Sequence, residues 1–310
     1  VQPLSELEVK AELLYNRIPF SKILFMINLS LGVLSFLLLL HNSLQRNILS
    51  PKAKTISRTA ETFFSVALYL AFIFHLAGYC LRWYISGRIP LSNGYETMQF
   101  MALCILLIAC LLHRRFPFIL PFGFLLSGFA LLVSYLGQMN PQITPLMPVL
   151  VSPWLSIHVS LIMMSYALLA FIMLNGILAL CLRKKESENN VSGNDAIQDN
   201  RIEQLTLVSR LLLYPATFFL GAGIFLGAVW ANVSWGRYWA WDPKEVWALI
   251  TFLVYGVAFH SQSLRIFRKP LFFHIYMILA FLTVLMTYFG VNYVLGGMHS
   301  YANAVSYTHL

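Results

Sequence analysis

The stretch LVSRLLLYPATFFLGAGIFLGAV, residues 207–229, is followed at once by WANVSWGRYWAWDPKEVW, residues 230–247. The first part is long and apolar enough to cross a hydrocarbon core about 30 Å thick, which takes roughly 20 helical residues. The second part holds five of the seven tryptophans of the chain. Apolar residues make up 59% of the chain, charged residues 11%, and the mean hydropathy is +0.71. These values are typical of a polytopic membrane protein and exclude a water-soluble globular domain.

Apolar segments of similar length recur along the chain, and no alternating barrel pattern accompanies them. Backbone polar groups in lipid must be hydrogen-bonded within the protein, so such segments are expected to be helices. The sequence therefore predicts an all-α membrane helix bundle with about eight transmembrane helices, at residues 22–40, 62–81, 97–112, 117–136, 157–182, 207–229, 245–264 and 271–294.

Lysine and arginine cluster in alternate loops, which predicts the orientation of the bundle by the positive-inside rule. By that rule the basic loops are cytoplasmic, and both termini and the tryptophan-rich loop lie outside. The loop from Gly137 to Ser156 contains no lysine or arginine, whereas the acidic, Asn-rich segment from Lys184 to Gln204 predicts a flexible cytoplasmic connector. The basic loop residues are Arg46, Lys52, Lys54, Arg58, Arg114, Arg115, Arg183, Lys184, Lys185, Arg265, Arg268 and Lys269.

The net charge of +9 does not indicate a nucleic-acid partner, because the basic residues form short clusters between apolar spans. A lipid bilayer is the surrounding that this composition implies. The cysteines lie within or at the ends of apolar runs and show no CxxC pair, so we expect them to be packing residues. They are Cys80, Cys104, Cys110 and Cys181.

The polar turn inside the tryptophan run has the sequence of a helix start. Asp242 suits the N-cap, Pro243 the first helical position and Glu245 the third position, which together predict a capping box. Asn93 and Glu96 have the same spacing at the start of the third predicted span. Both caps face outside in the predicted topology.

Three histidines are candidates for a functional site. His158 opens the fifth predicted span on the outside, and His299 closes the eighth on the same side. His260 lies about 15 residues into the seventh predicted span, roughly 22 Å below Glu245. Two outer imidazoles can ligate a haem iron from opposite faces, with tryptophans as an apolar platform. An interfacial aromatic belt and hydrogen-bonded packing histidines explain the same residues without a ligand.

Several motifs resemble one known family in the family's own order. WGRYWAWDPKE (235–245) resembles the WWD motif of haem-handling proteins. The segments RWYISGRIPLSNGYETMQF (82–100), SPWLSIHVSLIMMSYALL (152–169) and YFGVNYVLGGMHSY (288–301) are similar to segments of the CcsA family of System II cytochrome c biogenesis. The resemblance covers roughly residues 62–302, with the WWD loop at 230–245.

This resemblance implies haem export and attachment of haem to apocytochrome c on the outer membrane face, a holocytochrome c synthase type of activity. It implies that His158 and His299 ligate haem iron at the outer site and that His260 does so at an inner site. The substrate would be haem b with two histidine ligands, and no residue is expected to be catalytic in the acid-base sense. The cofactor-binding residues implied are His158, His299, His260, Trp235, Gly236, Trp239, Trp241, Asp242, Pro243 and Glu245.

The resemblance also implies partners and a location. The partners are a ResB-like (CcsB) half or subunit, an apocytochrome c and a thiol-reducing, thioredoxin-like protein. The location is the bacterial cytoplasmic (inner) membrane, with haem attachment facing the periplasm. Residues 1–61 resemble the junction of a ResB–CcsA fusion with the first span, so an upstream half is expected.

Some residues depart from the family pattern. No clear match is present for a second inner-site histidine, for which His41 is a weak candidate. The tail at 303–310 does not resemble the family's ending and is expected to be an artefact of the source sequence, so His309 carries no weight. Arg82 and Arg88 suit either a haem propionate or snorkelling to headgroups. His75, His113 and His274 are expected to be packing or interfacial residues.

Two alternatives remain open at this point. One is a System I haem-handling relative, which shares the WWD motif and outer histidines. The other is a small-molecule permease without haem, with the tryptophan run as an interfacial anchor and His260 as a proton relay.

Overall fold

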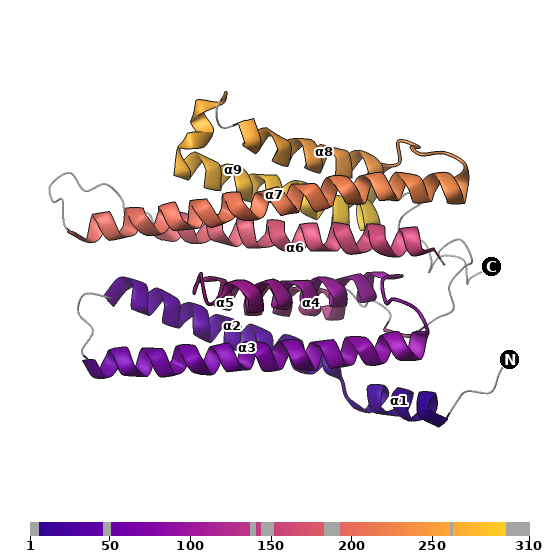
Figure 1. Cartoon of the computed structure of the whole chain (residues 1–310), viewed down its shortest axis with the longest axis horizontal. Helices are drawn as coiled ribbons and strands as arrows, with labels where there is room; N and C mark the ends of the chain where they lie inside the picture. The colour runs from indigo at the N-terminus through magenta and orange to yellow at the C-terminus, as the bar shows by residue number, and fades with distance from the viewer. Residues whose placement is uncertain are drawn as a thin grey trace. The chain divides into compact units, whose positions relative to one another are not determined.

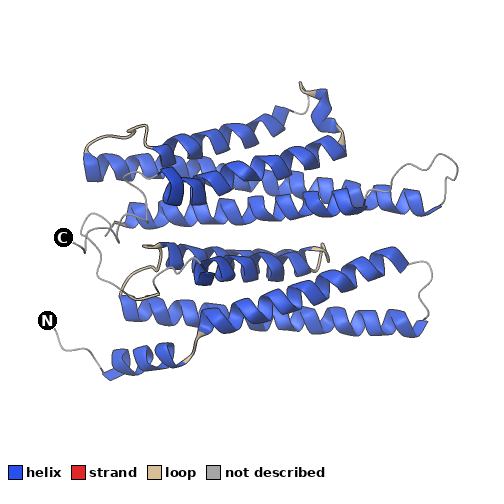
Figure 2. Ribbon diagram, turned by 180° about the vertical axis from the view of Figure 1, so that it is seen from behind, coloured by secondary structure: helices blue, strands red, loops and turns tan. Residues whose placement is uncertain are grey.

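A computed structural model of the chain describes residues 6–45, 51–136, 141–143, 152–182, 193–260 and 263–295. The described residues form helices joined by turns and loops, with no strand among them (Figures 1 and 2). The all-α prediction is thus confirmed. The chain divides into two compact units, residues 1–147 and 148–310.

The described residues of the first unit form five helices, four of them long and apolar (Figure 1). In this unit α2 packs on α5 and α3, α4 packs on α5 and α3, and α1 lies against α3. The helices are α1 (Glu6–Arg17), α2 (Phe20–Gln45), α3 (Pro51–Ser86), α4 (Gly94–Leu112) and α5 (Ile119–Leu136).

The second unit is built on the long antiparallel pair α6 and α7, which form its most extensive helix contact. The helix α9 packs on α6, and α8 packs on α7 and α9. The elements are α6 (Pro153–Leu182), α7 (Gly193–Trp235), α8 (Pro243–Val257), the 3₁₀ turns η2 (Ala258–His260) and η3 (Arg265–Arg268), α9 (Pro270–Leu285) and the π-helical η4 (Met286–Leu295).

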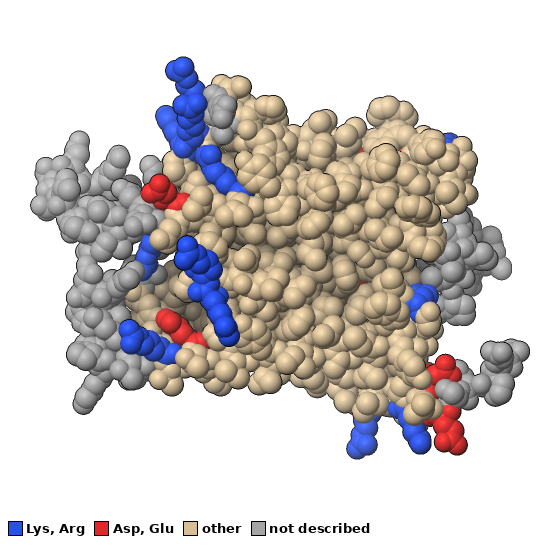
Figure 3. Space-filling view, viewed as in Figure 1, with Lys and Arg blue, Asp and Glu red and all other residues tan. Residues whose placement is uncertain are grey.

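Seven of the described helices are long and apolar enough to cross a membrane. Their outward faces carry large apolar side chains such as Leu70, Phe218 and Leu282, each more than half exposed, as expected of helices that face lipid. Figure 3 shows basic side chains toward the ends of the helices and a surface without charged residues between them. The orientation of the termini stays a prediction.

Two sequence expectations differ from the structure. The predicted span 245–264 is shorter, because α8 ends at Val257 and gives way to 3₁₀ turns where the polar residues His260 to Ser263 follow. The predicted flexible connector 184–204 is helical from Gly193 onward, since α7 extends well before residue 207. Extending an existing helix costs less than nucleating one, which lets the apolar span propagate into a polar segment.

Candidate functional site

The tryptophan run forms the end of α7, a short loop and the start of α8. Asp242 accepts a hydrogen bond from the Lys244 amide at 3.0 Å, and Pro243 is the first helical residue, so the predicted capping box is present. Glu245 Oε2 accepts from the amides of Asp242 at 3.3 Å and Ala240 at 2.8 Å. The carboxylate of Glu245 thereby fixes the loop as well as the helix start.

Two residues of this loop have left-handed backbone. Gly236 has φ +72° and Trp241 has φ +57°. Glycine adopts this conformation without cost, but a tryptophan there is strained by roughly 1–2 kcal/mol. The Trp241 side chain is 73% exposed and lies edge-on to Trp239, with ring centroids 6.0 Å apart. The loop therefore holds the Trp241 indole at its surface, beside the partly exposed Trp239, on a backbone that local propensity opposes.

The tryptophans at the end of α7 have a different environment. Trp230 is buried, and its ring meets Trp235 edge-on at 4.8 Å. The run thus ranges from the buried Trp230, through the partly exposed Trp235 and Trp239, to the mostly exposed Trp241.

His158 lies in the first turns of α6 and faces α7. Its Nδ1 is 2.6 Å from the carbonyl oxygen of Gly223, which can only accept, so Nδ1 carries the proton and donates. In the neutral ring the lone pair is then on Nε2, the atom that ligates a metal. A Cβ atom added to Gly227 would come within 2.7 Å of the imidazole. The ring therefore fits a gap that exists because residue 227 is glycine.

The distance of His158 from the tryptophan loop follows from the positions of its glycine neighbours on α7. Gly227 precedes Trp235 by eight residues, which is about 12 Å along α7. His158 consequently lies about two helical turns from the loop. It is not at the loop itself, as an outer ligand at the very end of the predicted span would be.

The other outer histidine, His299, lies outside the described residues, as do the tail 303–310 and His309. The segment before it is tied to the tryptophan loop, because Lys244 Nζ donates to Asn292 Oδ1 at 3.0 Å. Burial lowers the pKa of the Lys244 ammonium to about 8, an effect that the Asp242 carboxylate opposes. This contact joins η4, which ends at Leu295, to the first turn of α8.

His260 ends the η2 turn at the opposite end of α8 from the loop, and its side chain is exposed. The neighbouring Phe259 packs against Tyr214 of α7, with ring centroids 5.1 Å apart. His260 therefore lies on the surface of the second unit.

His75, His113 and His274 occupy packing positions, as predicted. His75 and His274 are buried and contact Gln99 at 3.1 Å and Thr206 at 2.9 Å respectively. His113 is buried beside the ring of Tyr69. His41 is exposed near the end of α2.

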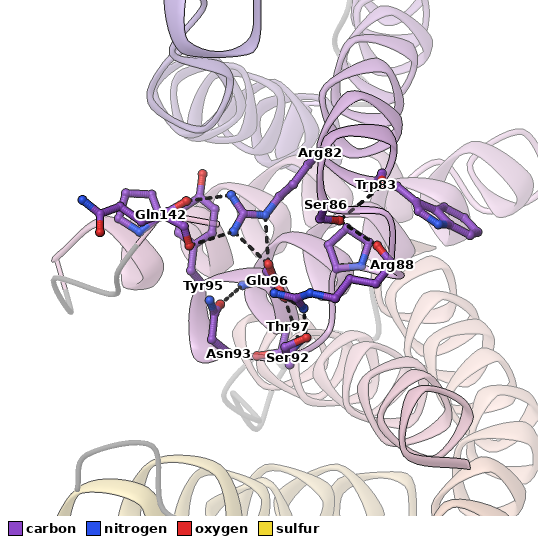
Figure 4. Close-up of polar contacts among 12 residues, drawn as sticks. Arg82, Trp83, Ser86, Arg88, Ser92, Asn93, Tyr95, Glu96, Thr97 and Gln142 are labelled. Atoms are coloured by element: carbon purple, nitrogen blue, oxygen red, sulfur yellow. Dashed lines mark hydrogen bonds and ion pairs between the residues drawn. The ribbon is translucent and has the colours of Figure 1, made fainter. Parts of the chain in front are cut away.

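The expectation for Arg82 was wrong, because Arg82 neither meets an external anion nor snorkels. Its guanidinium is buried and donates to Glu96 Oε1 at 2.8 Å and 3.1 Å (Figure 4). It also donates to the carbonyl of Pro141 at 2.7 Å and to the Tyr15 hydroxyl at 3.4 Å. Arg82 thus joins α3, α4, α1 and the segment after α5.

Glu96 is the other half of this buried cluster. Asn93 caps α4 by accepting from the Glu96 amide at 2.8 Å, as predicted. The Glu96 side chain instead pairs with Arg82 and with Arg88, and accepts from the Ser92 amide at 2.8 Å (Figure 4). Local spacing suggested a cap partner, but the nearby arginines take its carboxylate.

Sequence reasoning did not single out Gly223 and Gly227, which form the surface that His158 and Ile162 pack against. Their GxxxG spacing is the signal that could have found them, since small residues four apart let membrane helices approach closely. Lys244 and Asn292 were also missed. They are far apart in the sequence, so no local pattern relates them.

The fold and the site define a polytopic helical membrane protein with an aromatic loop and, about two helical turns from it, a histidine whose ring is held by a backbone carbonyl. The family described as "Cytochrome C assembly protein" matches residues 91–299. This chain belongs to that cytochrome c assembly family.

Individual relatives agree with the match. Protein NrfI of Wolinella succinogenes is 38% identical over 298 residues, which are 96% of this chain and 32% of NrfI. The cytochrome c biogenesis protein CcsA of Chlamydomonas reinhardtii is 37% identical over 71% of this chain and 63% of its own length. CcsA of Prochlorococcus marinus strain MIT 9515 is 33% identical over 88% of this chain and 92% of its own length. The chain thus spans about a third of NrfI and less than two thirds of the algal CcsA.

Proposed function

We propose that this chain handles haem during cytochrome c maturation and presents it to apocytochrome c at the tryptophan loop. Family membership and the names of the CcsA relatives support the role in maturation. The observation that carries the haem assignment is the His158 hydrogen bond to Gly223, which orients the ring with Nε2 as the ligating atom.

In this proposal His158 and His299 ligate haem as substrate at an outer site. Trp239 and Trp241 provide its apolar platform, with Trp235 and Gly236 at the base of the loop. Asp242, Pro243 and Glu245 hold the platform in place through the capping box. The fit is supported by the donor set, since a neutral imidazole fixed through Nδ1 is the usual form of a haem-ligating histidine.

The chemistry that follows is addition. Each thiol of a CxxCH segment adds across a haem vinyl group, so that a C–S bond forms and the thiol proton passes to the other vinyl carbon. The chain supplies position and protection from water for this step, and the thiols come from the substrate. A reductant of the thioredoxin-like class keeps those thiols reduced.

His260 is proposed as one ligand of an inner haem site, with the second ligand from a ResB-like half or subunit. Its exposure at the edge of the second unit supports a role that is completed by another group. The membrane is proposed to be a bacterial cytoplasmic membrane, with the outer site on the periplasmic face.

The absorption spectrum of the purified protein tests the proposal. After expression with ample haem, the protein should show a Soret band, and His158→Ala and His299→Ala should each reduce it and abolish maturation of a co-expressed c-type cytochrome. Added imidazole should partly restore haem binding by replacing the lost ligand. The control is His113→Ala, a histidine that packs beside Tyr69 and belongs to none of the proposed haem sites. Absence of a Soret band in the wild type would reject the proposal and favour a permease.

A further inference from the structure

Arg210 is a cation without a carboxylate partner in the described part of the chain. Its Nη2 donates to the carbonyl of Phe267 at 2.7 Å, and its guanidinium lies 5.1 Å from the centre of the Phe273 ring. Its buried Nε has no hydrogen-bond partner. A charge in such surroundings is costly unless an anion compensates it.

Arg210 lines a groove of about 430 Å³. One wall is a single face of α7, because Glu203, Thr206, Leu207 and Arg210 follow the spacing of one helical stripe. The other wall is formed by η3 and the start of α9, with Arg268 and Pro270. Two arginines face one glutamate in this lining, so the groove is positively charged.

One wall of the groove is fixed by hydrogen bonds, and the helix start at the other wall favours an anion. The Thr206 hydroxyl donates to Ile202 and is close to His274, so the wall behind it is fixed by hydrogen bonds. The helix α9 begins at Pro270 without a side-chain cap. The positive end of its helix dipole therefore adds to the charge of the arginines.

The groove lies at headgroup level. If Trp235 marks one interface, Arg210 is 25 residues away along α7, which is about 37 Å. This distance exceeds a hydrocarbon core of about 30 Å and falls within the headgroup region on the other side. Basic side chains gather at this end of α7 and η3, the end predicted to be cytoplasmic (Figure 3).

An exposed apolar stripe leads from the groove toward the middle of the membrane. Leu207, Leu211, Tyr214 and Phe218 recur at helical spacing on α7, and each is between 59% and 68% exposed. A ligand with an anionic head and an apolar chain matches a positively charged groove that continues into an apolar stripe, whereas a small free anion would not contact the stripe.

We infer that this groove binds the phosphate headgroup of an anionic membrane phospholipid, with Arg210 and Arg268 contacting the phosphate and an acyl chain lying along Leu207, Leu211, Tyr214 and Phe218. The lipid compensates the Arg210 charge and fills the gap between α7 and η3. This site is independent of haem and of the function proposed above.

Lipid retention by the full chain tests the site. The protein, purified without haem, is reconstituted in phosphatidylcholine vesicles that contain a minor fraction of phosphatidylglycerol, and bound lipids are identified by native mass spectrometry after extraction. The wild type should retain phosphatidylglycerol selectively. Arg210→Gln and Arg268→Gln should each weaken this retention by at least about tenfold, since each removes a charge-assisted hydrogen bond.

The control is Arg265→Gln, which removes the same charge from an exposed residue of η3 that does not line the groove. It should retain phosphatidylglycerol like the wild type. Arg210→Gln also removes a contact with Phe267, so its melting temperature in detergent is compared with that of the wild type. If Arg210→Gln does not fold, Arg268→Gln provides the test, because Arg268 is exposed.

Three results would overturn the inference. One is retention at the wild-type level in both Arg268→Gln and Arg210→Gln, or in Arg268→Gln alone if Arg210→Gln does not fold. Another is equal loss in Arg265→Gln, which would mean a diffuse effect of charge. The third is displacement of the lipid by inorganic phosphate at matched concentration, which would identify a site for a free anion.

Discussion

Trp241 carries two local costs, a left-handed backbone and a mostly exposed indole. His158 shows the converse, a polar ring fitted to one carbonyl and one glycine of the neighbouring helix. Strained residues that persist are held by their surroundings, which here means the hydrogen bonds of Glu245 to the loop amides. At the residue scale, therefore, hydrogen bonds hold both the loop backbone and the His158 ring in fixed positions.

Replacing Trp241 by glycine separates stability from haem retention. Glycine accepts the left-handed backbone without strain, so Trp241→Gly should leave the free energy of unfolding unchanged or raise it by roughly 1 kcal/mol. Haem retention, measured as Soret absorbance per protein, should fall because one of the two indoles of the Trp239–Trp241 pair is gone. Wild-type retention in this variant would remove Trp241 from the platform.

Gly227→Ala tests the position of His158. The new methyl group would come within 2.7 Å of the imidazole and push it from the Gly223 carbonyl, at a cost of roughly 1–3 kcal/mol in packing. Haem retention should drop toward that of His158→Ala. The control is Gly256→Ala in α8, where an added Cβ meets nothing within 4 Å, so that stability and haem content should be preserved. Equal haem content in both variants would contradict the proposed ligand role.

At the scale of elements, the joint at the start of α4 depends on a buried ion pair. Arg82 and Glu96 are almost fully buried, and their contacts bring α1, α3, α4 and the Pro141 segment together. The start of α8 is instead fixed by a capping box whose residues are close together in the sequence. The first joint is specified by tertiary contacts and the second by local sequence.

Glu96→Gln should therefore strongly destabilise the folded protein. It leaves the buried Arg82 charge without its partner, which typically costs about 3–5 kcal/mol. Chemical or thermal unfolding in detergent measures the loss. Glu6→Gln is the control, because Glu6 pairs with Lys10 at 3.9 Å on the surface, where such pairs contribute less than about 1 kcal/mol. Combining Glu96→Gln with Arg82→Met should recover part of the stability. A loss of less than about 1 kcal/mol in Glu96→Gln alone would show that the ion pair is not essential to the joint.

At the scale of the whole molecule, the charged side chains seen in Figure 3 gather toward the ends of the helices, and uncharged residues cover the surface between them. Within the second unit, the tryptophan loop and the η2–η3 segment lie at opposite ends of α8 (Figure 1). The positive-inside rule assigns the first to the outside and the second to the cytoplasm.

Single cysteines at these two ends test the orientation. In a background with the four native cysteines replaced by serine, Tyr238→Cys should react with a membrane-impermeant maleimide in intact cells. Ser263→Cys should react only after permeabilisation. Both positions are exposed, so access to the reagent depends on the side of the membrane. The reverse pattern would invert the topology and move the proposed haem site to the cytoplasm.

The boundaries that sequence predicted well are those set by local chemistry. The Asp242–Glu245 capping box and the Asn93 cap were both found from spacing, because capping involves residues within one turn. The end of α8 and the start of α7 were missed, since apolar content fades gradually there and the helix ends depend on the neighbours. The histidine candidates could be named from the sequence, but their surroundings could not.

The sequence by itself determined the class of protein, seven of the predicted helical spans, the capped starts of α4 and α8, and the resemblance to the cytochrome c assembly family. These depend on hydrophobic length and on interactions within a few residues, which a linear pattern records. Only the tertiary structure decided that Arg82 pairs with Glu96, that Gly223 and Gly227 hold His158, and that Arg210 faces a groove with Arg268. Those relations arise when helices distant in sequence pack together, and their partners are chosen by geometry and by the cost of leaving a buried charge or polar atom unsatisfied.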